Sequence, residues 1–176
     1  MSLRSGLAVA VPGIAPAIDG WRERTCDAKP STGVPPHVTL LFPFAPAREV
    51  DDALLFAVDQ LLGRFAPFGI TLARTARFPG VLYLEPEPAE PLRTLTVALV
   101  ERFPEYPPYE GVFGTDLVPH LTVAQGEDAV LDAAARDVEP ALPFRAAVRE
   151  ALLFEETEPD YGAWQLRARF QLRGAA

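Results

Sequence analysis

The residues of this sequence that could carry chemistry are its two histidines, and each lies in a copy of the same short motif. The segment VPPHVTL near position 37 is echoed by LVPHLTV near position 120. In each copy a threonine follows the histidine at the second position, which pairs His37 with Thr39 and His120 with Thr122. Because the chain has only two histidines, chance is a poor explanation, and we predict one site built from both copies.

Two imidazoles and two hydroxyls suit the cleavage of a phosphodiester. Imidazole has an ordinary pKa of about 6.5, so a pair can hold one neutral and one charged member near neutral pH. The neutral imidazole takes a proton from the attacking water, and the charged one gives a proton to the leaving oxygen. We therefore predict His37 and His120 as catalytic residues, with a bell-shaped pH profile around neutrality. Thr39 and Thr122 are predicted to bind substrate by donating hydrogen bonds to phosphate oxygens.

The same residues allow two other classes of site. Two histidines could bind zinc, but a stable zinc site generally has three or four ligands, and neither motif has an adjacent Cys, Asp or Glu. We therefore predict no metal and no cofactor. A protein that senses a nucleotide or an RNA end would keep the same cleft, and it would show binding without hydrolysis at any pH.

The pattern of both motifs predicts strands, which explains why each threonine stands two positions after its histidine. In an extended strand residues i and i+2 point to the same face, roughly 6.6 Å apart, so each histidine shares a face with its threonine. The residues between them are apolar and point the other way, toward a covering helix. These are Val38, Leu40, Leu121 and Val123.

The apolar pattern of the remaining chain predicts strands and helices in alternation. Strands are predicted at residues 7–11, 37–44, 68–76, 81–85, 117–124, 144–148, 151–156 and 164–172. Helices are predicted at residues 14–26, 50–65, 91–103 and 128–138. Proline and glycine mark loops at 30–36 and 104–114 and a turn at 79–80. We interpret the sum as an α+β fold with sheets covered by helices.

Composition narrows the class of partner. The chain has 176 residues, 49% of them hydrophobic, which suffices for one domain over residues 1–176. Its net charge of −8 argues against a long DNA duplex, because proteins that hold duplexes through their phosphates usually present a basic surface. No apolar run approaches the roughly 20 residues of a membrane span, and the first residues lack a signal-peptide pattern. We expect a cytoplasmic monomer with a small or single-stranded ligand and no membrane partner.

The paired His-hydrophobic-Thr-hydrophobic motifs, about 80 residues apart, resemble those of the 2H phosphoesterase superfamily. The resemblance is to its bacterial branch, called 2′-5′ RNA ligase-like or RNA 2′,3′-cyclic phosphodiesterase, and it spans most of the chain. It implies two pseudo-symmetric lobes of antiparallel sheet covered by helices, each giving one motif to a central cleft. It also implies that His37 and His120 are the catalytic pair and that Thr39 and Thr122 contact phosphate.

The sequence departs from this family at two places. Members often carry an arginine in the segment resembling residues 78–84, where this chain has Gly80, while Tyr83 stands where an aromatic wall residue is expected to bind substrate. Members also often have an arginine shortly after the second motif, and this chain continues through Gln125-Gly126 without one. The resemblance implies a metal-independent phosphodiesterase that opens a 2′,3′-cyclic phosphate at an RNA 3′ end or on a small nucleotide. Formation of a 2′-5′ RNA linkage in the same cleft is the alternative.

Overall fold

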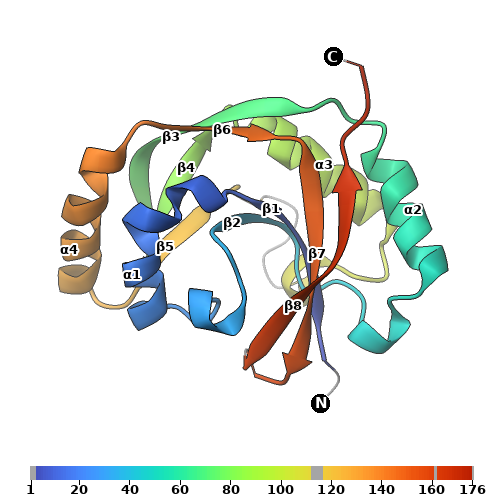
Figure 1. Ribbon diagram of the computed structural model, residues 1–176, viewed down its shortest axis with the longest axis horizontal. Helices are drawn as coiled ribbons and strands as arrows, with labels where there is room; N and C mark the ends of the chain where they lie inside the picture. Colours follow the sequence, from blue (N-terminus) through green and yellow to red (C-terminus); the bar gives the residue numbers. More distant parts are fainter. Residues whose placement is uncertain (1–2, 112–116, 161, 176) are drawn as a thin grey trace.

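The protein is built around one curved sheet (Figure 1). The computed structural model describes residues 3–111, 117–160 and 162–175. Within them eight strands pair in the order β6-β3-β4-β5-β2-β1-β7-β8, and all neighbours are antiparallel. The strands are β1 (Ser5–Ala10), β2 (His37–Leu41), β3 (Phe68–Phe78), β4 (Val81–Glu87), β5 (Leu121–Gln125), β6 (Phe144–Val148), β7 (Glu150–Glu158) and β8 (Ala163–Gln171).

The sheet has two halves of four strands each. One half, β6-β3-β4-β5, comes from a continuous stretch of chain, and the other, β2-β1-β7-β8, combines strands from both ends of the chain. The halves meet where β2 pairs with β5 through Val38 and Leu121. The two motif strands are therefore neighbours at the centre of the sheet. The α+β class with an antiparallel sheet is confirmed.

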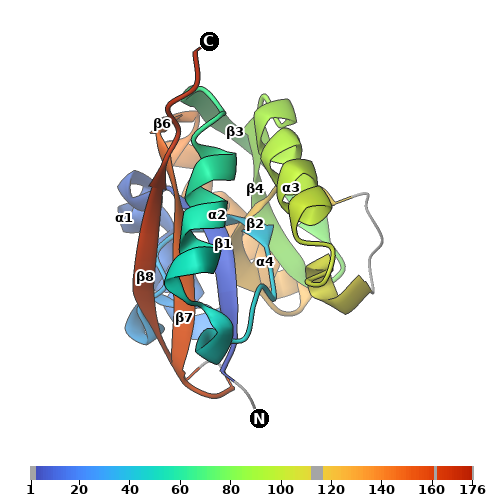
Figure 2. The ribbon, with the colours of Figure 1, turned by 90° about the vertical axis from the view of Figure 1, so that its right-hand side faces the viewer.

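Four α-helices cover the sheet in two pairs. They are α1 (Ala15–Thr25), α2 (Asp52–Leu62), α3 (Glu90–Arg102) and α4 (Asp128–Val138). Helices α1 and α4 lie together against β5, while α3 packs on β2 and α2 on β8 (Figures 1 and 2). The helix that follows β1 thus supports the motif strand of the other half, and α3, which follows β4, supports β2. Each half-sheet thus packs against a helix that follows a strand of the other half.

Most predicted elements form within two residues of their expected ends, and the two motif strands differ for a physical reason. Strand β2 ends at Leu41 rather than at residue 44, where Pro43 lacks the N–H that a ladder needs. Strand β5 begins at Leu121 rather than at residue 117, directly after the segment that contains Pro119. His120 therefore lies just before its strand, whereas His37 is the first residue of its strand. Part of the predicted loop 104–114 falls outside the described residues.

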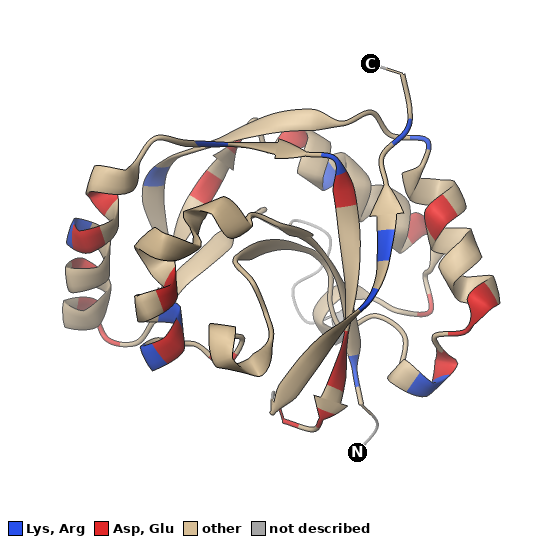
Figure 3. Ribbon diagram, in the orientation of Figure 1, with Lys and Arg blue, Asp and Glu red and all other residues tan. Residues whose placement is uncertain are grey.

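The central strands carry the core and few charges. The apolar residues between the motif positions are almost fully buried, as predicted; Val38, Leu40, Leu121 and Val123 are at most 1% exposed. Strands β1, β2 and β5 contain no Lys, Arg, Asp or Glu. The acidic side chains gather on outer elements such as α2 and α4 (Figure 3). No helix in the described residues is long and apolar enough to cross a membrane.

Candidate active site

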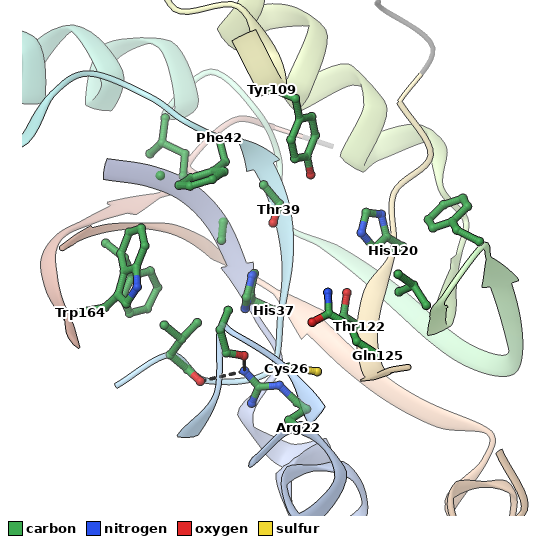
Figure 4. Close-up of a pocket in the computed structure, with 18 residues that line it drawn as sticks. Arg22, Cys26, His37, Thr39, Phe42, Tyr109, His120, Thr122, Gln125 and Trp164 are labelled. Carbon is green, nitrogen blue, oxygen red and sulfur yellow. Dashed lines mark hydrogen bonds between the residues drawn. The ribbon is translucent and has the colours of Figure 1, made fainter. Parts of the chain in front are cut away.

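The two motifs open on one pocket of about 320 Å³ at the junction of the two half-sheets. His37 and Thr39 line it from β2, Thr122 lines it from β5, and His120 lines it from the position just before β5. Figure 4 shows both imidazoles and both threonines facing the same space. This volume lies within the range of small-ligand sites. The structure thus brings together four of the five residues that the sequence singled out.

Both imidazoles are held in the same way from their Nδ1 side. The Nδ1 atom of His37 lies 2.8 Å from the carbonyl oxygen of Pro35, and that of His120 lies 2.8 Å from the carbonyl oxygen of Val118. A carbonyl oxygen only accepts hydrogen bonds, so Nδ1 is the donor in each ring. In the neutral form the free lone pair is therefore on Nε2. Each ring can exchange a proton with a ligand through Nε2.

The surroundings of both rings favour the neutral form. Burial lowers the pKa of His37 to about 4, with the positive charge of Arg22 and the other histidine acting in the same direction and the Pro35 carbonyl opposing them. Burial also lowers the pKa of His120, against the Val118 carbonyl. Arg22 is not among the causes for His120. The sequence left the two histidines equivalent, and the structure makes His37 the ring that more strongly resists protonation.

Tyr83 lies behind the pocket wall rather than in it. It sits on β4 opposite Thr122, is 7% exposed and is not among the lining residues. Its ring stacks on Phe78 at a centroid distance of 4.4 Å, and both rings meet His120 edge-on, at 5.6 Å from Tyr83 and 5.2 Å from Phe78. Phe78 lines the pocket in its place. The two aromatic rings restrict the orientation of His120.

The turn that carries Phe78 also explains Gly80. Phe78 pairs with Val81 at the end of the β3–β4 hairpin, and Gly80 adopts a φ of 73° in the turn between them. This left-handed conformation is favourable for glycine and strained for most other residues. The carbonyl oxygen of Gly80 also accepts a hydrogen bond from the N–H of Gly126 at 3.0 Å. Turn geometry thus accounts for the glycine at position 80.

Arg22 is a pocket residue that sequence reasoning missed. Its side chain is 2% exposed and lines the pocket from α1, close to His37. Of the described residues that line the pocket, it is the only Lys or Arg, and no Asp or Glu joins it. A signal was available in the sequence: Ile14, Ile18, Arg22 and Cys26 follow one another at a spacing of four, and all four are buried. An arginine in such an apolar stripe faces the core rather than water.

Gln125 also lines the pocket, although strand alternation predicts that its side chain points to the opposite face. Alternation from Thr122 would place Ala124 in the pocket, but Ala124 is fully buried. The register of the β4–β5 pairing shifts between Leu82 and Tyr83. Beyond this shift Gln125 faces the pocket with its side-chain amide (Figure 4). A bulge of this kind leaves no clear sign in the sequence.

The pocket also has an aromatic side formed by Phe42, Tyr109 and Trp164. Phe42 follows β2, Tyr109 belongs to the 3-10 helix Pro108–Gly111, and Trp164 belongs to β8. The rings of Phe42 and Trp164 lie 5.9 Å apart at 56°, and the N–H of Tyr109 donates to the carbonyl oxygen of Phe42 at 2.7 Å. In Figure 4, Trp164 and Phe42 lie on the far side of His37 and Thr39 from His120, and Tyr109 lies at the top of the view between Phe42 and His120. None of the three residues belongs to either His-x-Thr motif.

The donor set favours proton transfer over metal binding. Across the described ranges of the chain no three His, Cys, Asp or Glu side chains gather into a possible metal site. Both histidines already use Nδ1 for a backbone carbonyl. Cys26 is buried at the pocket, and burial raises the pKa of its thiol, which disfavours the thiolate that binds metals. The residues present therefore offer two imidazole Nε2 atoms, the hydroxyls of Thr39, Thr122 and Tyr109, the amide of Gln125 and the guanidinium of Arg22.

Most of the chain matches a known protein family. Residues 10–160 match the sequence profile of the 2′-5′ RNA ligase superfamily. The chain belongs to this superfamily, whose members are 2H phosphoesterases. No curated protein matches the sequence.

Several solved structures have a similar fold. The protein TT0787 of Thermus thermophilus is 26% identical with a TM-score of 0.65, over 98% of this chain and 100% of that one. LigT of E. coli in complex with 3′-AMP is 20% identical with a TM-score of 0.60, over 98% of this chain and 99% of LigT. LigT with NADP+ is 22% identical with a TM-score of 0.58, over 97% and 98% of the two chains. The fold is shared along nearly the whole chain.

Proposed function

We propose that this protein is a metal-independent phosphodiesterase that opens 2′,3′-cyclic phosphates at RNA 3′ ends or on small nucleotides. The observation that carries the proposal is the convergence of two Nε2 atoms and two threonine hydroxyls on one pocket. A cyclic phosphodiester needs one group to take a proton from water and a second to give a proton to the departing ribose oxygen. Two imidazoles supply both groups without a metal.

The unequal surroundings of the two histidines support an assignment of roles. His37 is the general base, since its lowered pKa keeps it neutral and able to accept a proton from water. His120 is the general acid and donates a proton to the leaving oxygen. Thr39 and Thr122 donate hydrogen bonds to the non-bridging oxygens, where negative charge grows in the transition state.

The aromatic side supports a nucleotide as the ligand. A base attached to the ribose would lie against Trp164 and Phe42, since aromatic rings bind the flat face of any base. LigT has been crystallised with 3′-AMP and with NADP+, both of which carry a base and a phosphate. For RNA, the family resemblance favours a 2′-phosphate product, formed when water attacks phosphorus, the P–O3′ bond breaks and the 3′ oxygen takes up a proton to become a hydroxyl.

Turnover of 2′,3′-cyclic mononucleotides and of a short RNA with a 2′,3′-cyclic end, in the presence of EDTA, tests this proposal. We expect wild type to be active and His37→Ala and His120→Ala to lose at least about 10²-fold in rate. Adding an RNA with a 5′ hydroxyl tests for formation of a 2′-5′ linkage. Abolition by EDTA with restoration by zinc would overturn the mechanism, and binding without turnover at any pH would identify a sensor.

A further inference from the structure

The guanidinium of Arg22 is tied to the segment that leads into β2. Its Nη2 atom donates to the carbonyl oxygens of Ala28 at 3.0 Å, Val34 at 2.9 Å and Pro35 at 3.3 Å. Its Nη1 atom donates to Asp19 at 2.7 Å, one turn earlier on α1. Arg22 therefore joins helix α1 to both ends of the loop that precedes His37.

One of these carbonyls is shared with the catalytic ring. The oxygen of Pro35 accepts from Nδ1 of His37 at 2.8 Å and from Arg22 at 3.3 Å. On the other side of the pocket, the oxygen of Val118 accepts from Nδ1 of His120 at 2.8 Å. Arg22 is the only arginine among the described residues that line the pocket, and it bonds the Pro35 carbonyl. The support of the two rings is thus unequal.

A buried arginine at this place is costly, which argues for a role beyond filling space. Removing a guanidinium from water costs several kcal/mol unless its hydrogen bonds are replaced. Three backbone carbonyls and one part-exposed carboxylate replace them here. The apolar stripe of α1, with Ile14 and Ile18, would accept a leucine or methionine at position 22 without that cost.

We infer that Arg22 is a positioning residue for His37, because it fixes the Pro35 carbonyl that holds Nδ1–H and so aims Nε2 at the pocket. The expected effect of Arg22 on the reaction rate rests on the proposed function, whereas its expected effect on the tautomer of the His37 ring does not. Without Arg22 the Pro35 carbonyl can turn, and neutral His37 can place its hydrogen on Nε2, which cannot accept a proton from water.

Arg22 also acts through its charge. The charged and titratable groups that bear on His37 are Arg22 from α1 and His120 from the position just before β5, and both disfavour a charged His37. Asp19 pairs with the Nη1 side of Arg22, with a side chain that is 31% exposed. Geometry and charge therefore both keep His37 neutral with Nε2 free.

The state of the two rings can be observed directly by NMR. The chain has two histidines, so long-range ¹H–¹⁵N spectra of the imidazoles, assigned with His37→Ala and His120→Ala, report both tautomers and both pKa values. We expect His37 of wild type to be the Nδ1–H tautomer from pH 5 to 8. In Arg22→Met we expect mixed tautomers and a raised His37 pKa, with the His120 signals unchanged. We also expect kcat to fall by about 10- to 100-fold with little change in KM.

Arg22→Lys separates charge from geometry and covers the possibility that Arg22→Met does not fold. A lysine keeps the positive charge, but its single nitrogen cannot serve both Asp19, which accepts from Nη1 of Arg22, and the three carbonyls, which accept from Nη2. We expect its His37 pKa to stay near that of wild type while the tautomers mix and kcat falls. A folded Arg22→Lys with the wild-type tautomer and kcat would overturn the inference. If wild type hydrolyses no cyclic phosphate but the His37 tautomer still depends on Arg22, the positioning role stands and the proposed function falls.

Discussion

Val38 pairs with Leu121, and this pair places the two histidines, because His37 and His120 each precede one of its members. Val38 and Leu121 are both fully buried. We expect Leu121→Ala to lower the free energy of unfolding by about 2–5 kcal/mol, the usual cost of emptying such a site. Urea denaturation measures this loss. Leu166→Ala on β8 is the control, since Leu166 is 40% exposed and should change stability by less than about 1 kcal/mol. Equal losses in the two variants would contradict the central place of this pair.

The two threonine hydroxyls should contribute to rate rather than to stability. Thr39→Val and Thr122→Val keep the branched shape that suits a strand and remove only the hydroxyl. We expect each to lower kcat by about 10²-fold, the scale for one donor to a developing oxyanion. Steady-state kinetics on a cyclic mononucleotide checks this. Thr71→Val on β3, outside the pocket lining, is the matched control and should leave kcat unchanged.

The lowered pKa values move the expected pH profile to the acid side of the neutral bell that ordinary histidines predict. His37 must be neutral, so the acid limb of kcat/KM should lie near its pKa of about 4. His120 must be protonated, and its pKa in the free protein is below 6.5. We therefore expect kcat/KM to begin its alkaline decline at a pH below 6.5. A bound phosphate favours the charged ring, so the alkaline limb of kcat should lie at higher pH than that of kcat/KM. A flat kcat/KM from pH 7 to 9 would contradict the roles given to the two rings.

The same shift makes stability depend on pH. The pKa of His37 is about 4 in the folded protein and about 6.5 when unfolded. Between these values the unfolded chain binds more protons, so stability rises with pH and is lost as pH falls from about 6.5 to about 4. We expect wild type to lose about 2–3 kcal/mol more than His37→Gln between pH 7 and pH 4.5. Urea denaturation at both pH values measures the difference, and parallel losses would show that His37 is not the group responsible.

The aromatic side should matter for substrates that carry a base. We expect Trp164→Ala to raise KM for a 2′,3′-cyclic mononucleotide about 10- to 100-fold, the value of one base–aromatic contact. It should leave glycerol 1,2-cyclic phosphate, which has no base, unaffected. Trp21→Ala is the control, because Trp21 bonds Asp137 on α4 and does not line the pocket. An unchanged KM in Trp164→Ala would place the base elsewhere.

The sequence allowed the motif strands and their faces to be predicted because strand periodicity is local. His37, Thr39 and the buried residues between them follow from alternation alone, and so do the ends of α4 and β6. The turn at residues 79–80 also follows from its proline and glycine. These features depend on neighbours in the chain, which is why a single sequence suffices for them.

The remaining parts of the site depend on contacts between distant segments. Tyr83 was expected in the wall, but the hairpin end places Phe78 between it and the pocket. The shift in the β4–β5 register brings in Gln125. Trp164 reaches the pocket because β8 pairs with β7 beside β1, a relation between the two ends of the chain. No local pattern encodes such contacts.

The strand order has a consequence for synthesis on the ribosome. Strands β3 to β6 are consecutive in the chain and neighbours in one half-sheet, so that half can pair as it emerges. Strand β1 emerges first, but Ser5 lies opposite Glu155, and one of its two neighbours is made almost last. A nascent chain that stops between residues 121 and 149 contains both histidines and leaves an edge of β1 open. Since an open strand edge is a template for pairing with other chains, we expect such incomplete chains to aggregate rather than to act as partial enzymes.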